Sequence, residues 1–359
     1  MISKLLPVKK PSSISNYTRI LSIAILVLAL TSSTYAQTSL PPRPADPYAD
    51  PAHDIYNPLR YIASNALTSV AFALILLVAL AQTFLTWKIG GKSMLAMVIA
   101  SYTFCVGLGL RFGLHAQPES KGIYIAEYLF VVLSPCGFIA ANYVLLGRLS
   151  RWLRCDRHLL IRPQKITLVF VMSDVVTFLV QAAGGSVSVS NKASTSLTGS
   201  RIFLAGLALQ LVSFLFFSIL YVRFLLRVYK LEPTAWSRDQ GKPFLQDWRS
   251  LAMAMVISCI GILIRSLYRT IELSEGYLGH LATTEAFFYG LDTLPLFIAI
   301  AIYVPFWPGR YVPDIEELKA LEEKWKLEGA GARDEEKATS SATGSERVEG
   351  VNERLPVEN

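Results

Sequence analysis

The chain has 359 residues, of which 52% are hydrophobic and 17% are charged, and its mean hydropathy is +0.41. Soluble proteins carry roughly 25% charged residues, so the composition excludes an ordinary soluble protein and indicates a membrane protein. The net charge of +7 is unevenly divided, because residues 311–359 hold thirteen acidic against seven basic residues. The positive excess therefore lies between the apolar segments, where it sets membrane orientation, and it does not predict a nucleic-acid partner.

The first 60 residues predict a signal peptide and an extracellular lead. Residues 1–36 combine four basic residues, an apolar run over 20–30 and the end Thr-Tyr-Ala, which is the pattern of a cleaved secretory signal. The apolar run is shorter than the roughly 20 residues that a span needs, which favours cleavage over an uncleaved anchor. Residues 37–60 are rich in proline, and we expect them to form an extended, unfolded lead.

Seven apolar blocks follow, and they predict an all-α, polytopic membrane domain over residues 61–310. The expected transmembrane helices are about 61–87, 93–114, 123–147, 166–186, 202–226, 250–273 and 283–306. A cleaved signal places the new N-terminus outside, so the loops after the first, third and fifth spans and the C-terminus lie in the cytosol. Most arginines and lysines of the loops fall on that side, which independently predicts the same orientation.

Residues 311–359 form the expected cytosolic tail. Its first part, 314–328, is compatible with a short charged helix that has Leu318, Leu321 and Trp325 on one side. The remainder is rich in Gly, Ser, Thr and Glu, a composition typical of disorder. Both ends of the chain are expected to be dispensable for the chemistry of the membrane domain.

Ionisable side chains inside the expected spans mark the candidate site, because a charge at bilayer depth costs several kcal/mol. In the sixth span Arg265, Arg269 and Glu272 share one helix face, and in the seventh Glu285, Tyr289 and Asp292 do. The two spans form an antiparallel hairpin, so similar depths predict two ion pairs, Arg265 with Asp292 and Arg269 with Glu285. The other candidates are Arg111, Glu127, Asp174, Gln181 and Gln210.

A polar cavity in the outer half of the bundle would solvate all these groups together. Asp174 and Asp292 would form its floor. The competing interpretation is that the ion pairs of the sixth and seventh spans only hold the helices in register.

Two prolines lie beside these charges. Pro295 frees the carbonyl of Leu291, next to Asp292, and Pro135 frees that of Val131. Broken helices beside buried charges are typical of transporters, although a plain kink is the simpler interpretation of Pro135.

Residues along all the expected spans resemble the fungal lipid-translocating exporter family, which includes aminocholesterol-resistance proteins and an exporter of sphingoid long-chain bases. The most specific part is the R-x-x-Y-R-x-x-E sequence from Arg265 to Glu272, followed by E-x-x-x-Y-x-x-D from Glu285 to Asp292. Shorter matches are Pro135, Ala140, Tyr143, Gly147, Arg148, Phe170, Asp174, Phe178, Gln181, Gly184, Gly185, Gly206, Leu207, Gln210, Gly276, Pro308, Gly309 and Arg310.

The resemblance extends from about residue 57 to 311. It implies a plasma-membrane protein that moves sphingoid bases or similar amphiphiles toward the outer leaflet and gives resistance to toxic lipids or drugs. Three positions depart from the family pattern: Phe104 stands where a Glu is frequent, Leu108 where a Tyr is, and Trp307 where a His is. Glu127 would replace the missing carboxylate, so the departures bear on the substrate and not on the fold.

The favoured function is therefore a lipid exporter. Asp174 and Asp292 would bind an ammonium group and Gln181 and Tyr289 the hydroxyls, with Arg111 and Glu127 in the same translocation site. The alternative is a seven-span receptor or sensor of lipids or stress, which shares the topology and the cavity but transports nothing.

An enzyme is disfavoured, because two of the four histidines are in loops on opposite sides and two are near the outer rim. They assemble neither a zinc site nor a Ser-His-Asp set. The sequence Gly-Gly-Lys-Ser at 90–93 has Thr86 where a P-loop needs its first Gly. We therefore expect no cofactor and no metal, and the expected partners are an amphiphilic substrate and membrane lipids; the sequence indicates no protein partner.

Overall fold

The computed structural model describes residues 44, 46–161, 163–188, 193–276, 279–325 and 327. The expected signal peptide, 1–36, and the tail beyond 327 lie outside the described residues.

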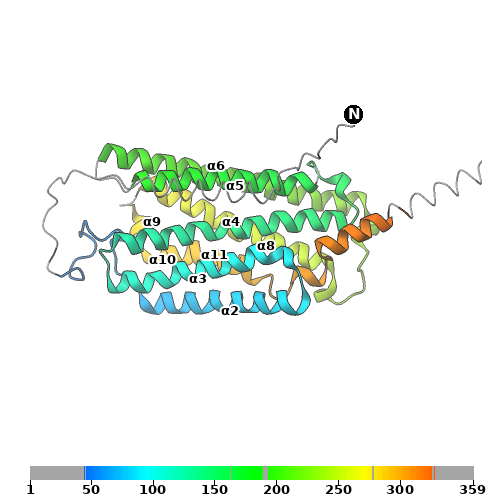
Figure 1. The fold of residues 1–359 in the computed structure, drawn as a ribbon, viewed down its shortest axis with the longest axis horizontal. Coiled ribbons are helices and arrows are strands. Elements are labelled where there is room, and N and C mark those ends of the chain that lie inside the picture. Colours follow the sequence, from blue (N-terminus) through cyan, green and yellow to red (C-terminus); the bar gives the residue numbers. More distant parts are fainter. Residues whose placement is uncertain are drawn as a thin grey trace, which may run out of the picture.

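Within the described residues every regular element is helical, and six helices are long and apolar enough to cross a membrane. They are α2 (Asn65–Ile89), α3 (Leu95–Ala116), α4 (Lys121–Trp152), α5 (Pro163–Ser188), α6 (Ala193–Leu231) and α8 (Trp248–Glu275). They run side by side along the long axis of one bundle (Figure 1). The all-helical, multi-pass membrane class is thereby confirmed.

The seventh apolar segment is interrupted. Its pieces are α9 (His280–Thr283), α10 (Glu285–Phe287), a π-helical segment (Phe288–Thr293) and α11 (Leu294–Ala301). The π-helical segment lies directly before Pro295, which has no N–H to donate, so the backbone hydrogen bonding shifts register there. The structure thus contains six long spans and a seventh segment whose helix is broken beside the candidate site.

Small residues let the helices approach closely. A Cβ atom added at Gly184 of α5 would lie 2.4 Å from the backbone nitrogen of Phe203 in α6. At Gly261 of α8 it would lie 2.5 Å from the carbonyl oxygen of Pro295 in α11. Close backbone approach through small residues is a main source of helix association in lipid.

The described part of the N-terminal lead is folded, which corrects the expectation of an unfolded segment over 37–60. It forms a series of turns at one end of the bundle (Figure 1). The Tyr48 hydroxyl donates to the carbonyls of His115 and Ala116, at 3.2 and 3.1 Å, and Asn57 is fully buried. Proline-rich sequence favours turns; here Asn57 hydrogen-bonds within the lead, to Leu59 and Tyr61, and Tyr48 attaches the lead to the end of α3.

The start of the tail is docked at the opposite end of the bundle (Figure 1). A helix covers 315–325, and its Leu318 is buried. Asp314 accepts a hydrogen bond from Arg148 at 3.2 Å, and the Arg154 guanidinium lies 3.9 Å from the ring centroid of Trp325. The expected short helix is therefore present, and it packs against the basic end of α4.

Candidate functional site

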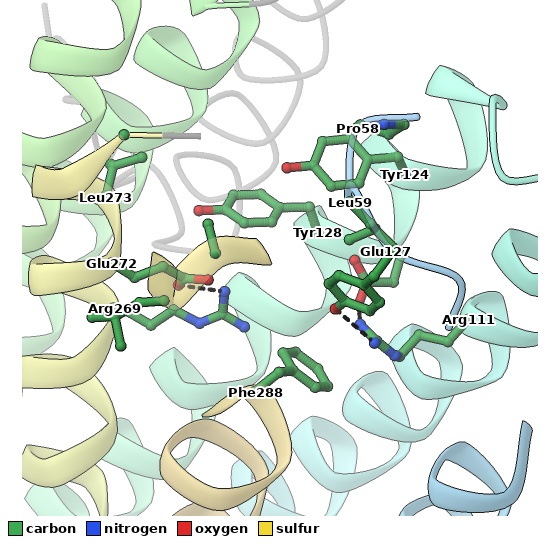
Figure 2. Close-up of a pocket in the computed structure, with 14 residues that line it drawn as sticks. Pro58, Leu59, Arg111, Tyr124, Glu127, Tyr128, Arg269, Glu272, Leu273 and Phe288 are labelled. Carbon is green, nitrogen blue, oxygen red and sulfur yellow. Dashed lines mark hydrogen bonds and ion pairs between the residues drawn. The ribbon is translucent and has the colours of Figure 1, made fainter. Parts of the chain in front are cut away.

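A cavity opens at the end of the bundle that carries the N-terminal lead. It is enclosed by the lead, α3, α4, α8, α9 and the π-helical segment, and its empty volume, open mouth included, is about 600 Å³. Its lining residues are Pro58, Leu59, Tyr61, Arg111, Tyr124, Glu127, Tyr128, Arg269, Glu272, Leu273, Gly276, Leu281, Ala282 and Phe288. Figure 2 shows Arg111 with Glu127 on one side of it and Arg269 with Glu272 on the other. We call this space the outer cavity.

Arg111 organises one side of the outer cavity, although its own side chain is only 1% exposed. Its guanidinium lies 3.3 Å from Glu127 Oε1 and 3.2 Å from Glu285 Oε1. It also donates to the hydroxyls of Tyr61 and Tyr289, at 3.0 and 3.2 Å. Two carboxylates and two hydroxyls therefore hold one buried cation, which is the condition under which a buried charge is tolerated.

Arg269 and Arg265 organise the other side. Both guanidiniums meet the fully buried Asp292, with Arg269 Nε at 2.6 Å and Arg265 Nε at 3.1 Å from Oδ1. Arg269 also reaches Glu272 Oε2 at 3.0 Å. The expected pair of Arg265 with Asp292 is therefore present, and Asp292 is shared between two arginines.

The expected pair of Arg269 with Glu285 is wrong. Glu285 binds Arg111 and accepts a hydrogen bond from the backbone N–H of Ser64 at 2.8 Å. The i, i+4, i+7 spacing assumes an α-helix, whereas Asp292 lies in a π-helical segment with i→i+5 bonding that follows the short α-helix of Glu285. The two carboxylates consequently face different neighbours, α3 and α8.

A single aromatic ring lies between the two sides. The guanidinium carbons of Arg111 and Arg269 are 4.1 and 5.4 Å from the ring centroid of Phe288. Cations are attracted to the face of an aromatic ring. The Phe288 ring thus makes a favourable contact with both guanidiniums, Arg111 and Arg269, beside the same cavity.

The carbonyl freed by Pro135 has a partner. Arg265 Nη2 donates to the carbonyl oxygen of Val131 at 3.0 Å. Pro135 removes the N–H that would otherwise satisfy this oxygen, so the proline creates a binding position for a guanidinium and is more than a kink.

Counting the charges of the whole cluster leaves one carboxylate in excess. Three arginines, Arg111, Arg265 and Arg269, face four carboxylates, and ion pairs join them all into two groups. The carboxylates are Glu127, Glu272, Glu285 and Asp292. An excess negative charge in a poorly hydrated site requires a proton or a further cation.

The predicted single cavity floored by Asp174 and Asp292 is wrong for the described structure. Neither residue lines the outer cavity, and nor do Gln181 and Tyr289. Asp174 and Gln181 belong to a second polar group between α4, α5 and α6. There Gln181 Nε2 donates to Gln210 Oε1 at 2.8 Å, and Gln210 Nε2 lies 3.4 Å from Cys136 Sγ.

The aromatic residues of the outer cavity are not among the site residues expected from the sequence. Tyr124 and Tyr128 of α4 project into it (Figure 2). Tyr61, from the segment before α2, also lines it. Tyr124 and Tyr128 are one helical turn apart and flank Glu127, a spacing that was available in the sequence. Tyr61 carried no such signal, because its position depends on how the lead folds back.

The chain is similar in sequence to fungal membrane proteins. A family model described as "RTA1 like protein" matches residues 97–315. Protein RTA1 of Saccharomyces cerevisiae is 31% identical over 212 residues, 59% of this chain and 64% of that protein. Protoporphyrin uptake protein 1 of the same yeast is 31% identical over 207 residues, 57% of this chain and 66% of that protein.

A sphingoid long-chain base transporter of Saccharomyces cerevisiae, RSB1, is 26% identical over 226 residues, 54% of this chain and 58% of that protein. The matched regions thus span between 58% and 66% of the length of these three relatives. No solved structure matches the chain.

Proposed function

Because the chain belongs to the RTA1-like family, we propose that it is a plasma-membrane transporter that moves cationic amphiphiles of the sphingoid-base type toward the outer leaflet. Relatives named as a sphingoid long-chain base transporter and a protoporphyrin uptake protein support membrane transport in general. We infer a cationic substrate because the charged cluster has one carboxylate more than it has arginines.

The proposal includes a seven-span topology with the N-terminus outside and the C-terminus in the cytosol. The interrupted segment 285–301 is the seventh crossing. The lead and the tail helix lie at opposite ends of the bundle, and the tail helix contacts the arginine-rich end of α4 (Figure 1). That arrangement agrees with the positive-inside rule.

Cysteine labelling tests this topology. Asp50→Cys and Asp156→Cys place thiols at exposed positions at the two ends. We expect a membrane-impermeant maleimide to label Asp50→Cys on intact cells and Asp156→Cys only after permeabilisation. The reverse pattern would show that the orientation is inverted.

In the proposed mechanism the outer cavity binds the head group and leaves the hydrocarbon chain in lipid. Glu127 and Glu272 face the cavity and receive the ammonium, and the hydroxyls of Tyr124 and Tyr128 meet the hydroxyls of the sphingoid base. Asp292 and Tyr289, which the sequence analysis assigned to the substrate, instead hold the arginines in place. A translocator needs only to lower the cost of moving a charged head group through hydrocarbon, which several preorganised polar groups do.

Substitution of the cavity carboxylates tests the proposal. Glu127→Gln leaves Arg111 paired with Glu285, and Glu272→Gln leaves Arg269 paired with Asp292, so both variants keep their arginines compensated. We expect each to lose at least tenfold in release of radiolabelled sphingoid base from cells that lack their own transporter. Glu316→Gln, at an exposed position of the tail helix, is the matched control.

Vesicles containing the purified protein separate a transporter from the receptor alternative. A transporter translocates a labelled sphingoid base without partners and does not translocate its N-acetyl derivative, which has no ammonium. Unchanged release by both Glu→Gln variants, or equal movement of the N-acetyl derivative, would contradict the cationic head-group site. Absence of any translocation would favour the receptor.

A further inference from the structure

Asp174 of α5 differs from the carboxylates of the charged cluster. It is 4% exposed, and both of its carboxylate oxygens lack a hydrogen-bond partner. Within the described part of the chain, Asp174 forms no ion pair with an arginine or lysine. The carboxylates of the charged cluster, Glu127, Glu272, Glu285 and Asp292, all lie in ion pairs. Asp174 is also separate from the outer cavity, which it does not line.

The surroundings of Asp174 are polar but not cationic. On α4, Tyr143 and Cys136 are the titratable groups that act on it, and α6 contributes Gln210, which does not titrate. The Tyr143 hydroxyl is the polar group that faces Asp174 most closely, and Gln181 Oε1 has no hydrogen-bond partner among the described residues. The Tyr143 ring is packed against Phe170, Phe214 and Phe217, with centroids 5.2, 6.4 and 4.5 Å away.

A carboxylate in this position cannot remain charged without compensation. Transfer of an isolated carboxylate into an apolar interior costs so much free energy that the group takes up a proton or binds a cation. One proton, or one other singly charged cation, is enough to neutralise the Asp174 carboxylate. The Tyr143 hydroxyl can donate a hydrogen bond to the charged Asp174 carboxylate and accept one from its protonated form.

We propose that Asp174 is a proton-binding site, distinct from the outer cavity, and that its proton exchanges against the ammonium of the transported amphiphile. Before the ammonium arrives, a proton on one Asp174 oxygen makes the side chain neutral. When the ammonium approaches, the proton leaves to water and the carboxylate is neutralised by the incoming cation. The exchange conserves charge, and this coupling rests on the proposed function, whereas proton binding itself does not.

The proton-binding step is tested on the purified wild-type protein without substrate. We expect the infrared spectrum at pH 7 to contain the carbonyl stretch of protonated carboxylic acids, and Asp174→Asn to lower its intensity by the contribution of one carboxyl, because the excess carboxylate of the charged cluster can hold a proton of its own. Asp156→Asn, at an exposed position, keeps the full intensity. Dicyclohexylcarbodiimide, which attacks protonated carboxyls in apolar surroundings, should modify Asp174 of the wild type, as mapped by mass spectrometry; this readout needs no variant to fold. An unchanged band in Asp174→Asn together with absence of the modification would overturn the proposal.

The exchange step is tested in vesicles with an imposed pH gradient. We expect a gradient of one pH unit to change the rate of sphingoid-base translocation several-fold in the wild type and to have no effect in Asp174→Asn. Equal responses of the two proteins would overturn the exchange. Glu127→Gln and Glu272→Gln, by contrast, should lose translocation at every pH, so failure of the outer-cavity site and failure of the proton site give different results.

Discussion

At the scale of single residues, the site is held together by carboxylates that serve more than one partner, of which Asp292 is the clearest. Asp292 is fully buried and compensates both Arg265 and Arg269 through Oδ1. Arg269 has a second carboxylate in Glu272, whereas the partners of Arg265 among the described residues are Asp292 and one backbone carbonyl. Arg265 is therefore the group most dependent on Asp292.

Asp292→Asn should destabilise the protein by about 3–5 kcal/mol, because it leaves the buried charge of Arg265 without a counter-ion. Thermal unfolding in detergent micelles measures the loss, with Asp156→Asn as the exposed control. The double variant Arg265→Met/Asp292→Asn removes the uncompensated charge as well, and it should be more stable than Asp292→Asn alone. A double variant no better than the single one would contradict the pairing.

At the scale of elements, the interrupted seventh segment depends on a close contact with α8. A Cβ atom added at Gly261 would lie 2.5 Å from the carbonyl oxygen of Pro295 and 3.1 Å from the Cβ of Ala299. Only glycine allows this approach. The contact lies one turn along α8 from Arg265, so it sets the distance between the helices that carry the Arg265–Asp292 pair.

Gly261→Ala should therefore push α8 and α11 apart and destabilise the protein by about 1–3 kcal/mol, the usual cost of overpacking. Gly290→Ala is the matched control, because a Cβ at that glycine of the π-helical segment meets nothing within 4 Å. The two melting temperatures in detergent provide the comparison. Equal values would show that the helices separate without cost.

At the scale of the whole molecule, the end of the bundle opposite the outer cavity is joined by surface ion pairs between distant loops. Glu232, at the end of α6, accepts hydrogen bonds from His158 Nε2 at 2.9 Å and from Arg157. These hydrogen bonds, from His158 first and Arg157 second, hold the pKa of Glu232 below its usual value. The pairs connect the loop after α4 with the loop after α6.

A lowered pKa in the folded state means that Glu232 contributes stability above the pKa of an unfolded glutamate, about 4.3, and loses that contribution as pH falls through the folded value. We expect Glu232→Gln to melt slightly below the wild type at pH 7 and the difference to disappear at strongly acidic pH. The effect should be small and salt-sensitive, because the pair lies near the surface. A difference that grows as pH falls would contradict this assignment.

The long spans could be predicted from sequence because hydropathy is a local property of each segment. The expected 93–114 and 250–273 agree closely with α3 and α8, and the charged residues of the site were identified because charges are rare within the apolar segments. The partner of Arg269 could not be predicted. The choice between Glu285 and Asp292 depends on a π-helical turn that changes which side each carboxylate faces.

The sequence by itself determined the membrane class, the order of the spans and the small set of charged residues within them, because a charge or an apolar run is visible without knowledge of any neighbour. Only the tertiary structure decided that Asp292 serves two arginines, that the lead closes over an outer cavity and that Asp174 lies apart from it without a counter-ion. These outcomes depend on distances between helices far apart in the chain. Rotation of one helix by a fraction of a turn changes them, and hydropathy does not record that rotation.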